Sequence, residues 1–150
     1  MDIKFVIASA VIIGVICLLS IIGLIVRSGR KKLTSYIQKK FDQSEIIGAT
    51  TKANFFGLKS KAGKQIRGNA AIILTKKQLV SLRALPFQAY SIPIKSIQRV
   101  SLPQTFNGKS IFAKLLCVHF TNESCEDSIA WAIQNPEKWK ESIEALLTRS

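Results

Sequence analysis

Residue types that carry catalysis or bind metals are scarce in this chain. It has one histidine, and nine Asp and Glu residues against 22 Lys and Arg. His119 alone cannot supply a multi-histidine metal site, and Cys117 and His119 together are too few ligands for zinc. Glu126 and Asp127 are neighbours and so point to opposite faces of a strand, which gives no pair of cooperating carboxylates. The composition predicts a protein that is not an enzyme and that uses no metal or cofactor.

Two further signals for chemistry are too weak to change this prediction. Gly108-Lys109-Ser110 resembles the end of a nucleotide-binding P-loop, but the position of that motif's first glycine is occupied by Pro103. Nucleotide hydrolysis is therefore excluded. Cys17, Cys117 and Cys125 show no metal-binding spacing, and we expect them to be reduced thiols.

Charge, proline and amide side chains are all absent from the stretch Phe5 to Val26. As a helix this stretch is about 33 Å long, enough to cross a hydrocarbon core of about 30 Å. A cleaved signal peptide is the alternative, but the run is too long, Asp2 cancels Lys4, and no small-residue cleavage site follows. We therefore predict a retained transmembrane helix over residues 5–26.

The residues after the apolar run predict how the helix is oriented. A basic cluster follows Val26, and such clusters stay on the cytoplasmic side of a membrane. We expect a single-pass protein of the cell membrane with its N-terminus outside and its C-terminal domain in the cytosol. The cluster consists of Arg27, Arg30, Lys31 and Lys32.

Residues 27–41 form a basic amphipathic linker next to the predicted span. Leu33, Tyr36 and Ile37 recur at helical spacing, and lysines lie between them. Such a stretch can lie in the lipid head-group layer or pack on the following domain, and its position favours the head-group layer. The candidate membrane-surface residues are Arg27, Arg30, Lys31, Lys32, Lys39 and Lys40.

Residues 42–150 are the right size for one domain and change to short, alternating segments typical of strands. The last two strands predict a hairpin in which Leu116 faces Trp131 and Val118 faces Ile129. One face of this hairpin is apolar, whereas the face with Cys117 is expected to meet solvent or an edge contact. We predict seven strands, near 52–58, 64–75, 79–85, 89–92, 97–101, 114–121 and 126–133.

A helix over residues 136–149 follows the strands. Asn135 is a good N-cap residue, and Pro136 suits the first helical position. Trp139, Ile143, Leu146 and Leu147 form an apolar stripe that the sheet is expected to cover.

Seven antiparallel strands in a partly open barrel with one C-terminal amphipathic helix describe a pleckstrin-homology-like (PH-like) domain of the α+β class. Residues from about 50 to 148 resemble small membrane-anchored bacterial proteins with a PH-like (GRAM-like) domain. The resemblance implies a fold and a bacterial source, but no catalytic residue. It rests on Gln65 to Asn69, Ile72 to Thr75, Ile92 to Ile94, Ile97, Leu115 to Phe120, Asp127 to Ala132 and Trp139.

A basic cluster surrounds the first predicted hairpin loop. Several ammonium groups on a Gly-containing loop attract phosphate, and in PH-like domains this loop is where phosphoinositide head groups bind. The alternative is a purely structural, solvated loop. The candidate lipid- or anion-binding residues are Lys59, Lys61, Lys64, Arg67 and Lys52.

The connection Pro103 to Ala113 carries Phe106, Ile111 and Phe112, which have no evident place in the sheet. They either pack under the barrel or offer an apolar contact to a partner or membrane.

The net charge of +13 favours acidic partners. Taken together, the sequence predicts a membrane-anchored cytosolic binding or scaffolding module that contacts anionic lipid or a protein partner. The alternative function is nucleic-acid binding by the basic domain, which is disfavoured because no aromatic and basic platform is evident.

Overall fold

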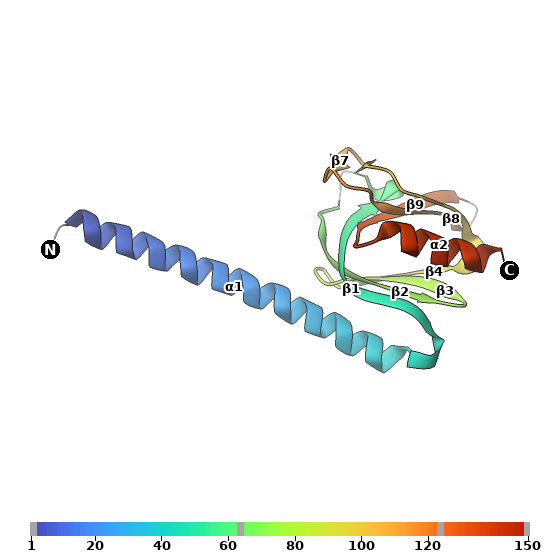
Figure 1. Ribbon diagram of the computed structural model, residues 1–150, viewed down its shortest axis with the longest axis horizontal. Coiled ribbons are helices and arrows are strands. Elements are labelled where there is room, and N and C mark those ends of the chain that lie inside the picture. The colour runs from blue at the N-terminus through green and yellow to red at the C-terminus, as the bar shows by residue number, and fades with distance from the viewer. Residues whose placement is uncertain (1–2, 63–64, 123–124, 149–150) are drawn as a thin grey trace.

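The computed structural model describes residues 3–62, 65–122 and 125–148. A long helix, α1 (Ile3–Lys40), leads into a β domain whose C-terminal helix, α2 (Pro136–Leu147), lies against the sheet (Figure 1). The domain sits beside the C-terminal half of α1, and the N-terminal half extends away from it. The predicted succession of an apolar helix, a seven-stranded antiparallel sheet and a final helix is confirmed.

α1 continues without a break through Val26, where the apolar run ends. No proline interrupts it, and Arg, Lys, Leu and Gln, which are good helix formers, make up most of the residues after Val26. Between Ile7 and Ile25 its large apolar side chains are exposed, for example Ile12 at 60% and Leu24 at 65%. Among the described residues, this is the one helix long and apolar enough to cross a membrane.

The apolar side chains of the predicted linker, residues 27–41, pack on the domain. Leu33 is completely buried and Ile37 nearly so, in a cluster that includes Ile73, Val80 and Leu82 of the sheet. The sequence favoured the lipid head-group layer for this stretch. That prediction is wrong for its apolar face, which packs on the sheet. A helical stripe looks the same in both situations, and here the outer side of the sheet provides the apolar surface that covers it.

Seven strands form one antiparallel sheet in the order β4-β3-β2-β1-β9-β8-β5. The edge strands β4 and β5 are consecutive in the chain and are joined by the short 3-10 helix η3 (Ile94–Ser96). The strands are β1 (Ile46–Leu58), β2 (Gly68–Thr75), β3 (Gln78–Arg83), β4 (Gln88–Pro93), β5 (Ile97–Ser101), β8 (Leu116–Asn122) and β9 (Cys125–Ala132). A separate small hairpin comprises β6 (Thr105–Phe106) and β7 (Lys109–Ser110), and the 3-10 helices η1 (Gln43–Glu45) and η2 (Lys59–Lys61) flank β1.

β1 connects the two halves of the sheet, because its first part pairs with β2 and its last part pairs with β9. Its register shifts between Thr50 and Ala53 and again between Phe55 and Gly57. Such irregularities bend a strand and interrupt the period-two pattern. This explains why β1 begins at Ile46 and not at the predicted Lys52.

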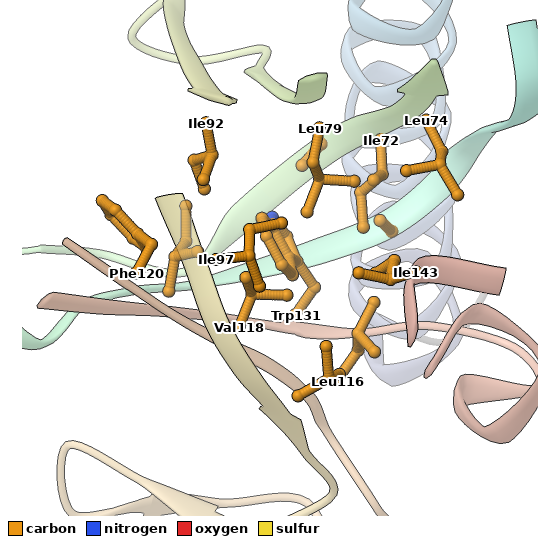
Figure 2. Close-up of a cluster of buried hydrophobic side chains, with 14 of the residues drawn as sticks. Ile72, Leu74, Leu79, Ile92, Ile97, Leu116, Val118, Phe120, Trp131 and Ile143 are labelled. Carbon is orange, nitrogen blue, oxygen red and sulfur yellow. The ribbon is translucent and has the colours of Figure 1, made fainter. Parts of the chain in front are cut away.

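The pairing predicted for the last hairpin is confirmed, with Val118 opposite Ile129 and Leu116 opposite Trp131. Trp131 lies at the centre of the core among side chains from both halves of the sheet (Figure 2). α2 closes this core with Ile143, which is completely buried. The core side chains labelled in Figure 2 are Ile72, Leu74, Leu79, Ile92, Ile97, Leu116, Val118, Phe120, Trp131 and Ile143.

Asn135 occupies the N-cap position of α2 but does not cap it as predicted. Its backbone is left-handed, with φ 52°, and its side chain makes no cap hydrogen bond. Its carbonyl oxygen instead accepts a hydrogen bond from the backbone N–H of Lys138 at 3.1 Å. Asparagine suits the position because it tolerates the left-handed region better than most residues do.

The second face of the β8–β9 hairpin is covered near its β6–β7 end. Phe106 packs there with Phe56, Leu115, Cys117 and Ala130, all buried. Of the three unplaced side chains in the connection after Pro103, Phe106 thus lies under the sheet. Phe112, in contrast, is 99% exposed.

Candidate functional site

The residues of the predicted basic cluster belong to η2, to β1 and to the segment before β2. Lys59 and Lys61 are exposed in η2, and Lys52 is exposed beside the irregularity in β1. Lys59 lies close enough to β8 to influence His119, and Lys61 lines a cleft. Lys64 lies outside the described residues.

Arg67 is held by neighbouring protein groups. Its guanidinium stacks on the ring of Phe56, 4.1 Å from the ring centroid, and its Nη2 donates a hydrogen bond to the carbonyl of Ser110 at 3.3 Å. The contact fixes the segment before β2 against β7. Arg67 therefore has a structural role in addition to its charge.

The β6–β7 hairpin braces the connection between β1 and β2. Lys109 Nζ donates to the carbonyl of Gln65 at 2.8 Å, and Asn107 Nδ2 donates to the carbonyl of Leu58 at 3.0 Å. Gln65 Oε1 in turn accepts the N–H of Leu58 at 2.7 Å. These bonds replace the strand ladder in this segment, which is why β2 begins at Gly68 and not at Lys64.

A cleft of about 540 Å³ lies between this braced connection and the turn from β3 to β4. That volume is within the usual range of small-molecule sites, about 300 to 1,000 Å³. Polar and basic groups line it from both sides. The lining residues are Ser60, Lys61, Ala62, Gln65, Ile66, Arg83, Pro86 and Gln88.

Arg83 is the unusual residue of this cleft. It is only 6% exposed, and its guanidinium lies 5.5 Å from the ring centroid of Phe55. Its Nη2 donates to the carbonyl of Ile66 at 3.0 Å, but its Nε is buried with no hydrogen-bond partner in the described chain. No described carboxylate forms a salt bridge with it. An arginine stays charged at any ordinary pH, so Arg83 is a buried cation without a counter-ion among the described residues.

The sequence prediction missed Arg83 because it lies outside the basic loop. The only local signal is strand alternation, which places Arg83 on the same face as Leu79 and Ser81 and so toward the core. A charge at an inward position is rare unless it has a partner.

The carboxylate beside η2 is already occupied. Asp127 accepts hydrogen bonds from the N–H of Ser60 at 3.0 Å and from its hydroxyl at 2.6 Å. These bonds tie η2 to β9. They fix the side of the cleft that carries Lys61, but they do not neutralise the charge of Lys61.

A cysteine, a histidine and a serine meet on the outer face of β5 and β8, but they do not form an activated nucleophile. His119 Nε2 lies 2.9 Å from Ser101 Oγ and 3.6 Å from Cys117 Sγ. Burial raises the pKa of the Cys117 thiol, and burial together with Arg99 and Lys59 lowers the pKa of His119. A buried, protonated thiol is a poor nucleophile. Among the described residues, no three His, Cys, Asp or Glu side chains are grouped to hold a metal.

The membrane-surface candidates on α1 are all exposed but lie at different distances from the apolar run. Arg27, Arg30, Lys31 and Lys32 follow it within two helical turns. Lys39 and Lys40 lie about 20 Å further along the axis than Val26, because the helix continues unbroken. This separation exceeds the screening length of about 8 Å in physiological salt.

Comparison with protein-family models finds no match to this chain, and a search of curated proteins finds none either.

Proposed function

We propose that the protein is a single-pass membrane-anchored binding module whose PH-like domain lies in the cytosol and binds a phosphate-bearing anion in the cleft beside Arg83. The strand order β4-β3-β2-β1-β9-β8-β5 and the single helix packed on the core support the PH-like assignment. The exposed apolar half of α1 supports the anchor, and the basic cluster after Val26 supports the cytosolic orientation.

The observation that carries the ligand class is the buried guanidinium of Arg83, whose Nε has no hydrogen-bond partner and which has no carboxylate partner among the described residues. A buried charge is costly unless a partner compensates it, and a phosphate oxygen matches the donors of a guanidinium. Lys61 adds a second cation to the cleft, and Gln88, whose Oε1 accepts a hydrogen bond from Tyr90, adds the N–H donors of its side-chain amide. The chemistry therefore fits a small anion with several oxygen atoms.

Such an anion has two sources, a phospholipid head group or a soluble phosphate compound. The test is a calorimetric titration of the full chain in a neutral detergent, with dihexanoyl phosphatidylglycerol in one arm and inorganic phosphate in the other. Binding of the lipid alone assigns the site to a head group, whereas equal binding of both assigns it to soluble phosphate.

The variants for this titration are Lys61→Gln, which changes an exposed side chain, and Arg83→Lys, which keeps the charge but loses the forked donors. We expect Arg83→Lys to weaken binding about tenfold or more, because hydrogen bonds to charged groups contribute roughly 1.5 to 3 kcal/mol. Lys61→Gln should weaken it less. Lys76→Gln, in the turn at the opposite end of β3, is the matched control and should bind normally. Normal binding by Arg83→Lys and Lys61→Gln refutes the site.

A further inference from the structure

Large apolar side chains are exposed at one end of the β domain. They belong to three loops: the β1–β2 connection, the β3–β4 turn, and the residues after β7. Their exposed fractions range from 37% to 99%. We name these five side chains the apolar rim: Ile66, Leu85, Phe87, Ile111 and Phe112.

Hydrogen bonds connect the three loops that carry the rim residues. The β6–β7 hairpin is bonded to the β1–β2 connection through Lys109 and Gln65. That connection meets the β3–β4 turn through Arg83, whose guanidinium binds the carbonyl of Ile66. The same end of the domain is turned toward the N-terminal half of α1 (Figure 1).

One of the three loops, the β3–β4 turn, lies beside the part of α1 that follows the predicted span. A Cβ atom on Gly29 would be 3.5 Å from the Cβ of Ala84. The rings of Tyr36 and Phe87 are 5.2 Å apart, and Lys32 Nζ lies 5.6 Å from the Phe87 centroid. Gly29 is about 4.5 Å beyond Val26 along the helix axis. The head-group region on each side of a bilayer is roughly 5 to 7 Å thick, so Ala84, at the start of the β3–β4 turn, lies at its depth. Phe87 lies further out, beside Lys32 and Tyr36, which are roughly 9 and 15 Å beyond Val26 along the helix axis.

Phe112 supplies an independent observation. It is 99% exposed and has a φ of 56°. Positive φ values are common for Gly and tolerated by Asn and Asp, but they are unusual for a bulky residue such as Phe. Its backbone N–H donates to Ser110 Oγ at 3.2 Å. Strained backbone conformations cluster at binding sites, and the exposed ring of Phe112 is available for a contact outside the domain.

We propose that the apolar rim inserts into the head-group and acyl boundary of the same bilayer that holds α1. The inference rests on the membrane anchorage stated under the proposed function. The occupant of this surface is the phospholipid leaflet, because α1 holds the β3–β4 turn close to it and Lys32 and Lys109 supply positive charge beside two of the loops. The domain is then attached at its loops as well as through α1, and the Arg83 cleft, which lies between two of these loops, faces lipid head groups.

The test uses the full chain in phosphatidylcholine and phosphatidylglycerol vesicles. Single cysteines replace Phe112, Leu85 or Lys76 in a background of Cys17→Ser, Cys117→Ala and Cys125→Ser, and each carries an environment-sensitive fluorophore. A lipid carrying a quencher on its acyl chain should reduce the fluorescence at positions 112 and 85 by at least half. Position 76, in the exposed β2–β3 turn at the other end, should stay unquenched.

A label at Leu19, inside the predicted span, separates the two claims. Quenching at position 19 but not at 112 or 85 refutes rim insertion and leaves the anchor intact. Absence of quenching at position 19 refutes the anchor and the rim together. A rim variant, Phe112→Ser with Leu85→Ser, checks the result without a label, because it should make the domain at least twofold more accessible to protease at the vesicle surface.

Discussion

The indole Nε1 of Trp131 donates a hydrogen bond of 2.8 Å to Oγ of Ser81, and both residues are completely buried. The bond joins β9 to β3 across the core, so it connects the two halves of the folded sheet. It also satisfies the only polar atom of the largest core side chain, which would otherwise be buried without a partner.

Ser81→Ala should lower the free energy of unfolding by about 1 to 3 kcal/mol, because it leaves the Trp131 N–H buried and unsatisfied. Chemical denaturation of the full chain in a neutral detergent measures the change. Trp131→Phe in the same background completes a double-mutant cycle. If the two substitutions are simply additive, the bond does not couple the two halves of the sheet.

Leu33→Ala should destabilise the protein by roughly 2 to 5 kcal/mol, since Leu33 is completely buried between α1 and the sheet. Ser35→Ala, at an exposed position two residues further along the helix, is the control and should change stability little. Equal stability of the two variants indicates that α1 does not pack on the domain in solution.

The stability of the domain should fall as the pH drops from neutrality through about 6.5. The pKa of His119 is lowered from that value by burial, then by Arg99 on β5 and Lys59 in η2, while Glu126 on β9 acts in the opposite direction. The unfolded chain therefore takes up a proton more readily than the folded one does, and protonation favours unfolding. Denaturation midpoints of the wild type and of His119→Gln at pH 7.5 and 5.5 check this (pH values at about one unit on either side of the ordinary pKa). The difference between the midpoints at the two pH values should be smaller for His119→Gln than for the wild type. An identical difference for both proteins contradicts the prediction.

Arg67→Met should lower stability by about 1 to 2 kcal/mol, because it removes the stacking on Phe56 and the hydrogen bond to Ser110. Lys52→Met removes the same charge from an exposed side chain and is the matched control. Thermal unfolding distinguishes the two variants. A normal melting temperature for Arg67→Met contradicts its structural role.

The sequence predicts the parts of the fold that depend on local pattern. The apolar run, the facing pairs of the β8–β9 hairpin and the buried stripe residue Ile143 of α2 each follow from spacing along one element or one turn. The linker helix is different, because its stripe fits lipid and sheet equally well until the outer face of β2 and β3 is known.

The cleft could not be predicted in the same way. Arg83 gains its role from Ile66 and Phe55, which lie on other strands or connections and meet it only after the sheet folds over. The basic loop is visible in the sequence, yet η2 directs Lys59 and Lys61 toward different surroundings. The two lysines are the same residue type, and their surroundings differ because of which strands and connections lie beside each of them in the folded domain.

The most direct test of the proposed site observes the Arg83 Nε–H by NMR in the ¹⁵N-labelled full chain in a neutral detergent. Dihexanoyl phosphatidylglycerol and, separately, inorganic phosphate are added, and the Arg99 Nε–H serves as the internal reference because it lies on the exposed face of β5. The account predicts that at least one ligand shifts the Arg83 resonance well beyond that of Arg99 and slows its exchange with water. An Arg83 resonance that stays in place at saturating concentrations of both ligands contradicts the account.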